Sequence, residues 1–187
     1  SSPHLDNPDR GFSFMNAGPL DMRMDQKSGR TATDIVNSSS QEELANILYR
    51  YGELKSSRKL AEIIIQNRPY KFTNELAAGI PGPFKQRMRI LAQVFQALRI
   101  VVNDELGQLS ESLPMWHQLL NKGGRLAVIT FHSLEDRIVK QYFQENGAEE
   151  YGSELQILTK RPIVAGRDEL VFNPRARSAK LRVVQRK

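Results

Sequence analysis

The clearest hydrophobic pattern is a short apolar run from Leu126 to Phe131, between a Gly-Gly pair and a polar cluster. Glycine adopts backbone angles closed to other residues, so the pair at 123–124 predicts a turn. The run contains valine and isoleucine and no charge, which predicts a strand covered on both faces, as in a parallel sheet. Ser133 is expected to cap a following helix, with Asp136 at the capping-box position.

Several polar side chains arrive together where this strand is expected to end, namely His132, Ser133, Glu135, Asp136 and Arg137. Open α/β sheets bind ligands where buried strands end and helices begin, so the cluster is a candidate site. A helix cap with a solvated first turn explains the same residues, and spacing alone favours this second interpretation.

The pattern before this unit predicts helices. A capping box at Ser40 and Glu43 begins one helix, a second starts near Ser56, and a short one starts at Thr73. Apolar residues from Met88 to Leu109 follow the spacing of one continuous helix face. A further helix is expected to open at Pro114, with these side chains facing inward: Trp116, Leu119 and Leu120.

The two ends of the chain are less regular. Residues 1–26 predict an ordered loop, because they combine three prolines and three glycines with many apolar side chains; residues 21–25 could equally form a short strand. Leu155–Thr159 predicts a strand. Leu181 and Val183 alternate with polar residues, as in a half-buried strand. The chain therefore predicts one buried strand, a helix and two further strands, which is only the edge of a doubly wound sheet. Further strands of that sheet are expected outside this chain.

The composition is that of a globular protein with one ordinary core and room for a small second lobe: 187 residues, 40% hydrophobic and 26% charged. No apolar run approaches the roughly 18 residues of a membrane span. The absence of cysteine excludes disulfides and thiolate metal sites and fits a cytoplasmic location. The chain begins Ser-Ser-Pro without an initiator methionine, so we expect a fragment of a longer protein.

The sequence lacks the motifs of several common kinds of binding and catalytic site. The chain has no G-x-G pair for a phosphate-binding loop and no G-x-S-x-G elbow for a nucleophilic serine. A metal site could be imagined from Asp21, Asp25, His132 and Asp136, but the three histidines show no ligand spacing, so no metal is expected.

Contact with nucleic acid is better supported. The net charge is +6 and the pI is about 9.7, which suits a polyanionic partner. Arginine matches phosphate geometry, and clustered cations release counterions on binding. The cations gather in the first loops and near the C-terminus: Arg10, Arg23, Arg30, Arg175, Arg177, Lys180, Arg182, Arg186 and Lys187. The alternative is a basic face that contacts only solvent.

Six stretches occur in fixed order: SSPHLD, DRGFSFM, GPLDMRMD, FQALRIVVNDEL, GGRLAVITFHSLEDRIVK and NPRARSAKLR. Together they closely resemble the C-terminal part of the bacterial 16S ribosomal RNA cytosine-N4 methyltransferase family (small-subunit methyltransferase H, MraW type). The resemblance implies an α/β fold, the C-terminal part of a class I, Rossmann-like methyltransferase with an inserted all-helical lobe. Residues 1–29 would be a loop segment completing the methyltransferase domain, 30–86 the helical lobe, and 87–187 the C-terminal part of that domain. The two final strands would form the reversed edge of the sheet.

The resemblance also implies S-adenosyl-L-methionine as cofactor and 16S rRNA, within the small ribosomal subunit, as partner. The family's glycine-rich loop and acidic ribose-binding residue precede Ser-Ser-Pro and are absent here. Among the recognised cofactor positions only one remains, and His4 occupies it. This chain alone is therefore expected to bind the cofactor weakly or not at all, and to be inactive alone.

Cytosine N4 is a poor nucleophile, because its lone pair is delocalised into the ring. A methyltransferase of this kind must therefore position the amine and accept its hydrogen bonds. The candidate catalytic residues are Asp21, Asp25, His132 and Asp136. Contacts with RNA phosphates are expected from Arg10, Arg23, Arg137, Arg175, Arg177, Lys180 and Arg182. A non-catalytic RNA-binding module or inactive truncated relative remains the main alternative, and a metal-dependent nuclease is a second.

Overall fold

The structure is a computed structural model that describes residues 7–27, 29–147 and 153–187. The chain divides into two compact units, Ser1–Glu105 and Leu106–Lys187. The α/β class predicted from the sequence is confirmed. The predicted domain boundaries at 29/30 and 86/87 remain a prediction. No helix within the described ranges is long and apolar enough to cross a membrane.

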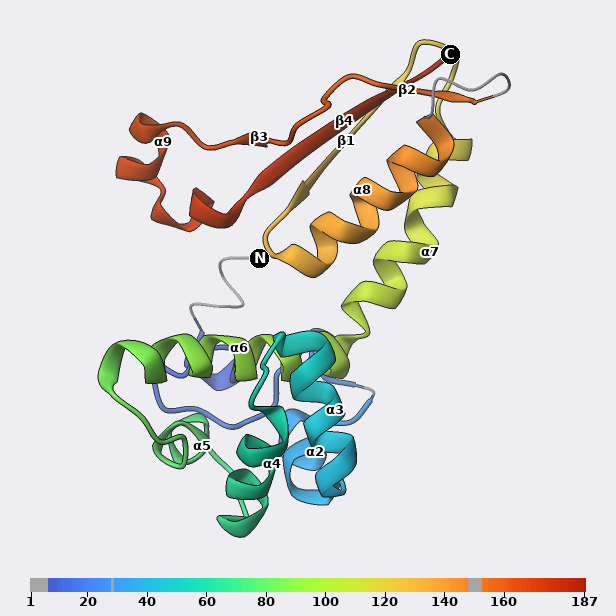
Figure 1. The fold of residues 1–187 in the computed structure, drawn as a ribbon. Coiled ribbons are helices and arrows are strands. Elements are labelled where there is room, and N and C mark those ends of the chain that lie inside the picture. Colours follow the sequence, from blue (N-terminus) through green and yellow to red (C-terminus); the bar gives the residue numbers. More distant parts are fainter. Residues whose placement is uncertain (1–6, 28, 148–152) are drawn as a thin grey trace. The chain divides into compact units, whose positions relative to one another are not determined.

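The first unit is helical. It contains η1 (Pro8–Arg10), α2 (Ala32–Ser38), α3 (Gln41–Gly52), α4 (Ser57–Gln66), α5 (Thr73–Ala78) and α6 (Phe84–Asn103), in blue to green in Figure 1. The predicted capping box of α3 is confirmed: Ser40 Oγ accepts from the Glu43 N–H, and the Glu43 carboxylate accepts from the Ser40 N–H. Helices α3, α4 and α6 pack around one apolar core, with Leu44, Leu48 and Leu98 almost fully buried.

The first six residues of the loop predicted over 1–26 lie outside the described residues. Residues 11–26 form a loop held by hydrogen bonds, and residues 21–25 are not a strand. Met22 is fully buried and has a φ of 65°, a left-handed conformation incompatible with a regular strand. Gly18 fixes the loop against α5, because its N–H donates to Thr73 Oγ1 (3.1 Å) and its carbonyl accepts from the Thr73 N–H (2.9 Å).

Gly18→Ala is expected to lower the free energy of unfolding by about 2–3 kcal/mol, because the new methyl group overpacks the loop. A Cβ at Gly18 would lie 1.9 Å from the carbonyl oxygen of Pro8, a backbone atom that cannot rotate away. Urea unfolding of the chain measures the change. Gly166→Ala is the control, since no atom lies within 4 Å of its added Cβ and its φ is an ordinary −71°. Equal stability of both variants would contradict the expectation.

The long helix predicted over 88–109 is wrong in its continuity. Helix α6 ends at Asn103, Asp104 adopts a left-handed φ of 46°, and α7 (Glu105–Gln118) begins at the next residue. The Asn103 carboxamide explains the break, because its Nδ2 donates to the carbonyls of Arg99 and Met22 while its Oδ1 accepts from the Met24 N–H. These bonds tie the end of α6 to the first loop.

The orientation predicted for the next helix is also wrong. Pro114 lies inside α7 rather than at its start. The buried positions of α7 are Leu113 and His117, four residues apart on one face. Trp116 is 40% exposed, because it does not share the face of Leu113 and His117, and Leu119, just after the end of the helix, is 80% exposed.

The second unit holds a small sheet and the helices around it: β1 (Arg125–Thr130), α8 (Ser133–Gly147), β2 (Leu155–Ile157), β3 (Ile163–Val164), α9 (Arg167–Phe172), η2 (Pro174–Ser178) and β4 (Lys180–Arg186). Figure 1 shows α8 running beside the strands. The order is β1-β4-β2, with β3 also on β4 and every pairing antiparallel. Strand β4 therefore lies between β1 and β2. Among the described strands, only β4 runs in the opposite direction to the others. The resemblance implied that both final strands form a reversed edge, and this expectation is not met for β2.

The expectation that β1 is covered on both faces is not met among the described residues. Val128 and Thr130 are 8% and 2% exposed, whereas Ile129 between them is 58% exposed. Strand β1 has one described neighbour, β4, and α8 packs against both strands. The half-buried strand predicted near the C-terminus is present as β4, but its buried residues are Arg182 and Val184, while Leu181 and Val183 are only partly buried.

Candidate functional site

The polar cluster predicted after β1 lies at the junction of β1 and α8. His132 is the residue before α8, and its Nδ1 accepts a hydrogen bond from the Glu135 N–H at 3.3 Å. In return, Glu135 Oε2 accepts from the N–H groups of Phe131 (2.7 Å) and His132 (3.3 Å). The helix is therefore capped by His132 and Glu135, one residue earlier than the predicted pair of Ser133 and Asp136. Glu135 three residues after His132 was the available sequence signal.

The capping bond determines which ring nitrogen of His132 carries the proton. When Nδ1 accepts, the neutral imidazole carries its hydrogen on Nε2, so Nε2 is a donor. This Nε2 lies 3.5 Å from Glu135 Oε1, and the side chain is 9% exposed. His132 is therefore arranged to donate from Nε2 rather than to accept there.

Asp136 joins α8 to β4 through a buried ion pair. Its Oδ1 accepts from Arg182 Nε at 2.7 Å, and its Oδ2 accepts from Arg182 Nη2 at 3.2 Å and Lys180 Nζ at 3.0 Å. Asp136 and Arg182 are 8% and 7% exposed. The hydrogen bond from Arg182 is the main reason why the pKa of Asp136 lies below its ordinary value, although burial opposes it. Arg182, expected from the sequence to contact RNA, is thus committed to a carboxylate inside the unit.

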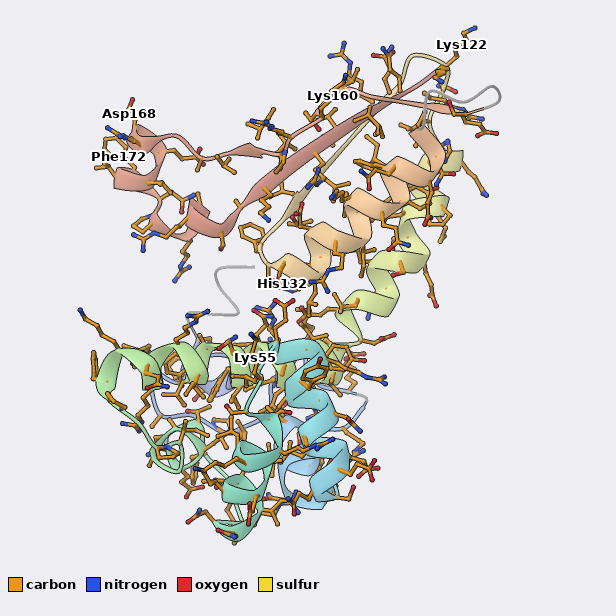
Figure 2. All side chains as sticks on the ribbon, viewed as in Figure 1. Lys55, Lys122, His132, Lys160, Asp168 and Phe172 are labelled. Carbon is orange, nitrogen blue, oxygen red and sulfur yellow. The ribbon has the colours of Figure 1, made fainter. Side chains whose placement is uncertain are left out.

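Two of the other C-terminal cations, Arg175 and Arg177, lie on a segment that we call the C-terminal arm, residues 161–178. It comprises β3, α9 and η2, and α9 contains no buried residue. Arg175 and Arg177 are exposed on η2, which leads directly into Lys180, the partner of Thr130 in the sheet register. The arm therefore leaves the sheet at the same edge as His132. Phe172, labelled with His132 in Figure 2, is 90% exposed. Arg137 is exposed on the first turns of α8.

In the first unit, the candidate carboxylates belong to the loop after η1. Asp21 forms a paired hydrogen bond with Arg23, with Oδ1–Nε at 2.8 Å and Oδ2–Nη2 at 2.9 Å, and this bond is the main cause of the lowered pKa of Asp21. Asp25 Oδ1 accepts from the Lys27 N–H at 2.9 Å. Arg10 Nη2 donates to the carbonyls of Arg23 (2.7 Å) and Met24 (2.9 Å), so Arg10 and Arg23 both hold this loop together. His4 lies outside the described residues.

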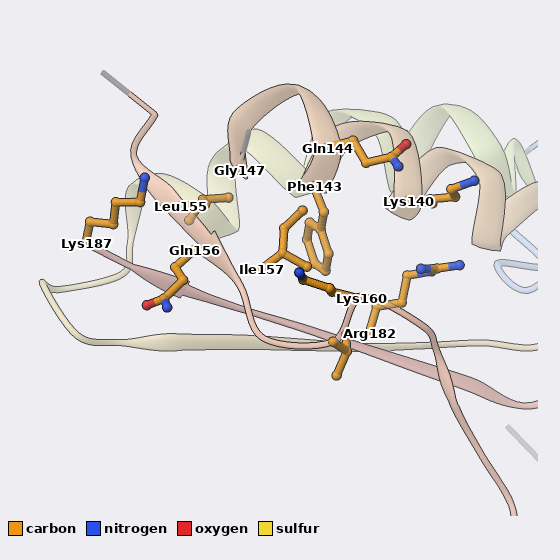
Figure 3. A pocket seen from close by; sticks show the side chains of 11 residues that line it. Lys140, Phe143, Gln144, Gly147, Leu155, Gln156, Ile157, Lys160, Arg182 and Lys187 are labelled. Atoms are coloured by element: carbon orange, nitrogen blue, oxygen red, sulfur yellow. The ribbon is translucent and has the colours of Figure 1, made fainter. Parts of the chain in front are cut away.

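A further feature, which sequence reasoning missed, is a groove between the second half of α8 and the strands β2 and β4. It has a volume of about 710 Å³. Figure 3 shows Lys140, Lys160 and Arg182 around an apolar floor that includes Phe143 and Ile157. None of the described residues that line it is acidic. We call this feature the basic groove.

The basic groove does not fit S-adenosyl-L-methionine. The cofactor carries a sulfonium cation and a ribose, for which carboxylate oxygens are the suitable partners, and the described lining offers none. The lysine and arginine side chains of the groove would match only the cofactor's own carboxylate. The described residues therefore offer no cradle for the cofactor in the basic groove. The one remaining cofactor position implied by the sequence, His4, lies outside the described residues.

Comparison with known proteins gives a consistent result. A sequence profile of the MraW methylase family matches residues 1–187. A protein of Synechocystis sp. named ribosomal RNA small subunit methyltransferase H is 49% identical over 187 residues, which cover 97% of this chain and 59% of the relative. Proteins of the same name from Rippkaea orientalis and Acidobacterium capsulatum are 48% and 46% identical over the whole chain and 61% and 63% of their own length.

The chain thus spans about three fifths of the length of the curated relatives that it matches. The match nevertheless runs through both compact units, from the first loop to β4, and includes the junction of β1 and α8 with its surrounding cations. The chain belongs to the MraW methylase family.

Proposed function

We propose that this chain is the C-terminal part of an S-adenosyl-L-methionine-dependent enzyme that methylates N4 of a cytosine in 16S rRNA, in the decoding region of the small ribosomal subunit. The observation that carries the proposal is the family match over the whole chain, together with relatives at 46–49% identity named for methylation of small-subunit rRNA. The cofactor supplies the methyl group when bound, and its contacts are expected from outside the described residues.

The chain's own contribution would be to hold the target cytosine. The base has to leave its stack to reach an active site, and its amine must be held by acceptors while the lone pair localises. Asp21, Asp25 and Asp136 are the candidate acceptors, since an ionised carboxylate only accepts and can accept several hydrogen bonds at once. Asp21 and Asp136 would accept from the amine in addition to their bonds from Arg23 and Arg182. His132 is better suited to donate from Nε2 to the O2 or N3 of the base, because its Nδ1 accepts from the helix backbone.

The C-terminal arm supports an RNA substrate. Arg175 and Arg177 provide exposed guanidinium groups close to the edge of the sheet at which His132 lies. Phe172, 90% exposed, is available for stacking on an unpaired base, an interaction worth about 1–3 kcal/mol per base in single-strand binding. Arg10, Arg23 and Arg182 are left out of the proposed RNA contacts, because each donates to a carbonyl or a carboxylate within its own unit. Lys180 also donates to Asp136, but its side chain is 38% exposed, so it stays in the set with the exposed Arg137.

The proposal is tested by transfer of a labelled methyl group from S-adenosyl-L-methionine to 16S rRNA, using the complete gene product that contains residues 1–187. We expect labelled N4-methylcytosine in the digested RNA, and no transfer when that cytosine is replaced by uracil. The 187-residue chain alone is expected to transfer nothing and to show no low-micromolar cofactor binding by calorimetry. RNA binding without methyl transfer by the complete protein would favour the non-catalytic RNA-binding module. Tight cofactor binding by the chain alone would contradict the proposal that the cofactor contacts lie outside the described residues.

A further inference from the structure

The basic groove is a second concentration of cations that the reaction does not use. Its lining comes from three separate segments: the second half of α8, strand β2 with the residues that follow it, and strand β4. Lys140 and Lys160 are exposed at the groove, whereas Arg182 is bound to Asp136 on one side. Its floor is apolar, with Phe143 and Leu155 almost fully buried.

The charge of the groove is one-sided. The described lining carries lysine, arginine and glutamine and no acidic residue, while Glu149 and Glu150 lie outside the described residues. Of the groove's own cations, Arg182 is paired with Asp136. Outside the groove, Lys180 is also paired with Asp136, and Arg186 donates to the carbonyls of Gln118 and Leu120. Lys140 and Lys160 have no acidic neighbour among the described residues that line the groove, and cations gathered in a hollow raise the local concentration of polyanions.

The groove is also separate from the candidate reacting edge. His132 immediately precedes α8, whereas Lys140 and Gly147 lie in the helix's second half. At 1.5 Å per residue, Gln144 is roughly 18 Å along the helix from His132. This distance corresponds to about five nucleotides at the 3.4 Å rise of a duplex strand.

We infer that the basic groove binds the phosphate backbone of the substrate RNA several nucleotides away from the cytosine that is methylated. The inference rests on the proposed function, which supplies the RNA. Lys140 and Lys160 neutralise phosphates at the rim, and the amides of Gln144 and Gln156 donate to phosphate or ribose oxygens. The groove thus contributes affinity without reading sequence, because phosphate contacts carry no base information.

The test is the salt dependence of RNA binding by the complete gene product. The variant is Lys140→Gln/Lys160→Gln, and the control is Lys55→Gln/Lys122→Gln, which removes the same charge from exposed lysines outside the groove (Figure 2). For an RNA with about ten nucleotides on each side of the target, the groove variant should lower the slope of log K against log salt by about 1.4, at roughly 0.7 per single-strand phosphate contact. The control should leave it unchanged.

A second measurement separates the groove from the reaction. On a short RNA with only one or two nucleotides beside the target, methyl transfer by the groove variant should equal that of the wild type, because such an RNA does not reach the groove. The inference would be overturned if the slope of log K against log salt were unchanged in the groove variant, or were lowered equally in the control. Methyl transfer by the wild type would still support the proposed function in that case. Failure of the wild type to bind or methylate either RNA would count against both.

Discussion

Replacing Asp136 with asparagine is expected to lower the free energy of unfolding by about 3–5 kcal/mol, the usual cost of removing one partner from a buried ion pair. The substitution keeps the shape of the side chain and removes its charge. Arg182, only 7% exposed, would then keep a buried guanidinium without a carboxylate at 2.7 Å. Urea unfolding of the 187-residue chain at pH 7, followed by circular dichroism, measures the loss.

Two controls make this expectation specific. Asp168→Asn removes the same charge from an exposed position on α9 and should change the free energy of unfolding by less than about 0.5 kcal/mol. A double variant, Asp136→Leu with Arg182→Leu, removes both charges together and should be far less destabilised than Asp136→Asn, because no charge is left buried alone. An Asp136→Asn variant as stable as the wild type would show that the ion pair is not structural and would return Asp136 to a purely catalytic interpretation.

The pair also gives a pH dependence with a definite sign. The folded-state pKa of Asp136 lies below its ordinary value of 3.8. A carboxyl group with a lowered pKa stabilises the fold above the unfolded pKa, and this stabilisation is lost as the pH falls through the folded pKa. The difference in unfolding free energy between wild type and Asp136→Asn should therefore be constant above about pH 5 and close as the pH falls below about 4.

The sequence predicted those features that depend on neighbouring residues. The capping box at Ser40, the turn at the Gly-Gly pair and the succession of β1 and α8 need only local signals, and all are present. The break between α6 and α7 could not be predicted in this way. It depends on hydrogen bonds from Asn103 to Met22 and Met24, about 80 positions earlier in the sequence.

The candidate site shows the same division. The place of the polar cluster, after β1 and before α8, could be predicted, but its bonding could not. Asp136 was expected as a cap, and it instead pairs with Arg182, 46 positions away. The alternation of apolar and polar residues on β4 did not show which face is buried, because Val183 and Val184 are adjacent. Arg182 can lie on the buried face because the carboxylate of Asp136 pairs with it. The basic groove joins three segments and has no linear signature at all.

His132→Asn, in the complete gene product, is expected to lower the rate of methyl transfer by about 10²-fold, the usual cost of losing one positioned hydrogen-bonding group. This prediction rests on the proposed function. Asparagine is among the best N-cap residues, so its side-chain oxygen can take over the bond that Nδ1 accepts from the Glu135 N–H. The free energy of unfolding should therefore change by well under about 1 kcal/mol. Single-turnover methylation at saturating RNA and thermal melts give the two quantities.

His132→Ala completes the experiment, because it removes the ring and the cap together. If the imidazole contacts the base, both variants should be equally slow, and only the alanine variant should lose about 1 kcal/mol of stability. If His132 acts only by capping α8, asparagine should restore both stability and turnover, and alanine should impair both. Near-normal turnover of His132→Asn would remove His132 from the candidate site. Equal slowing of both variants, with only alanine destabilised, would place the Nε2 donor at the base, because capping is the one function that asparagine retains.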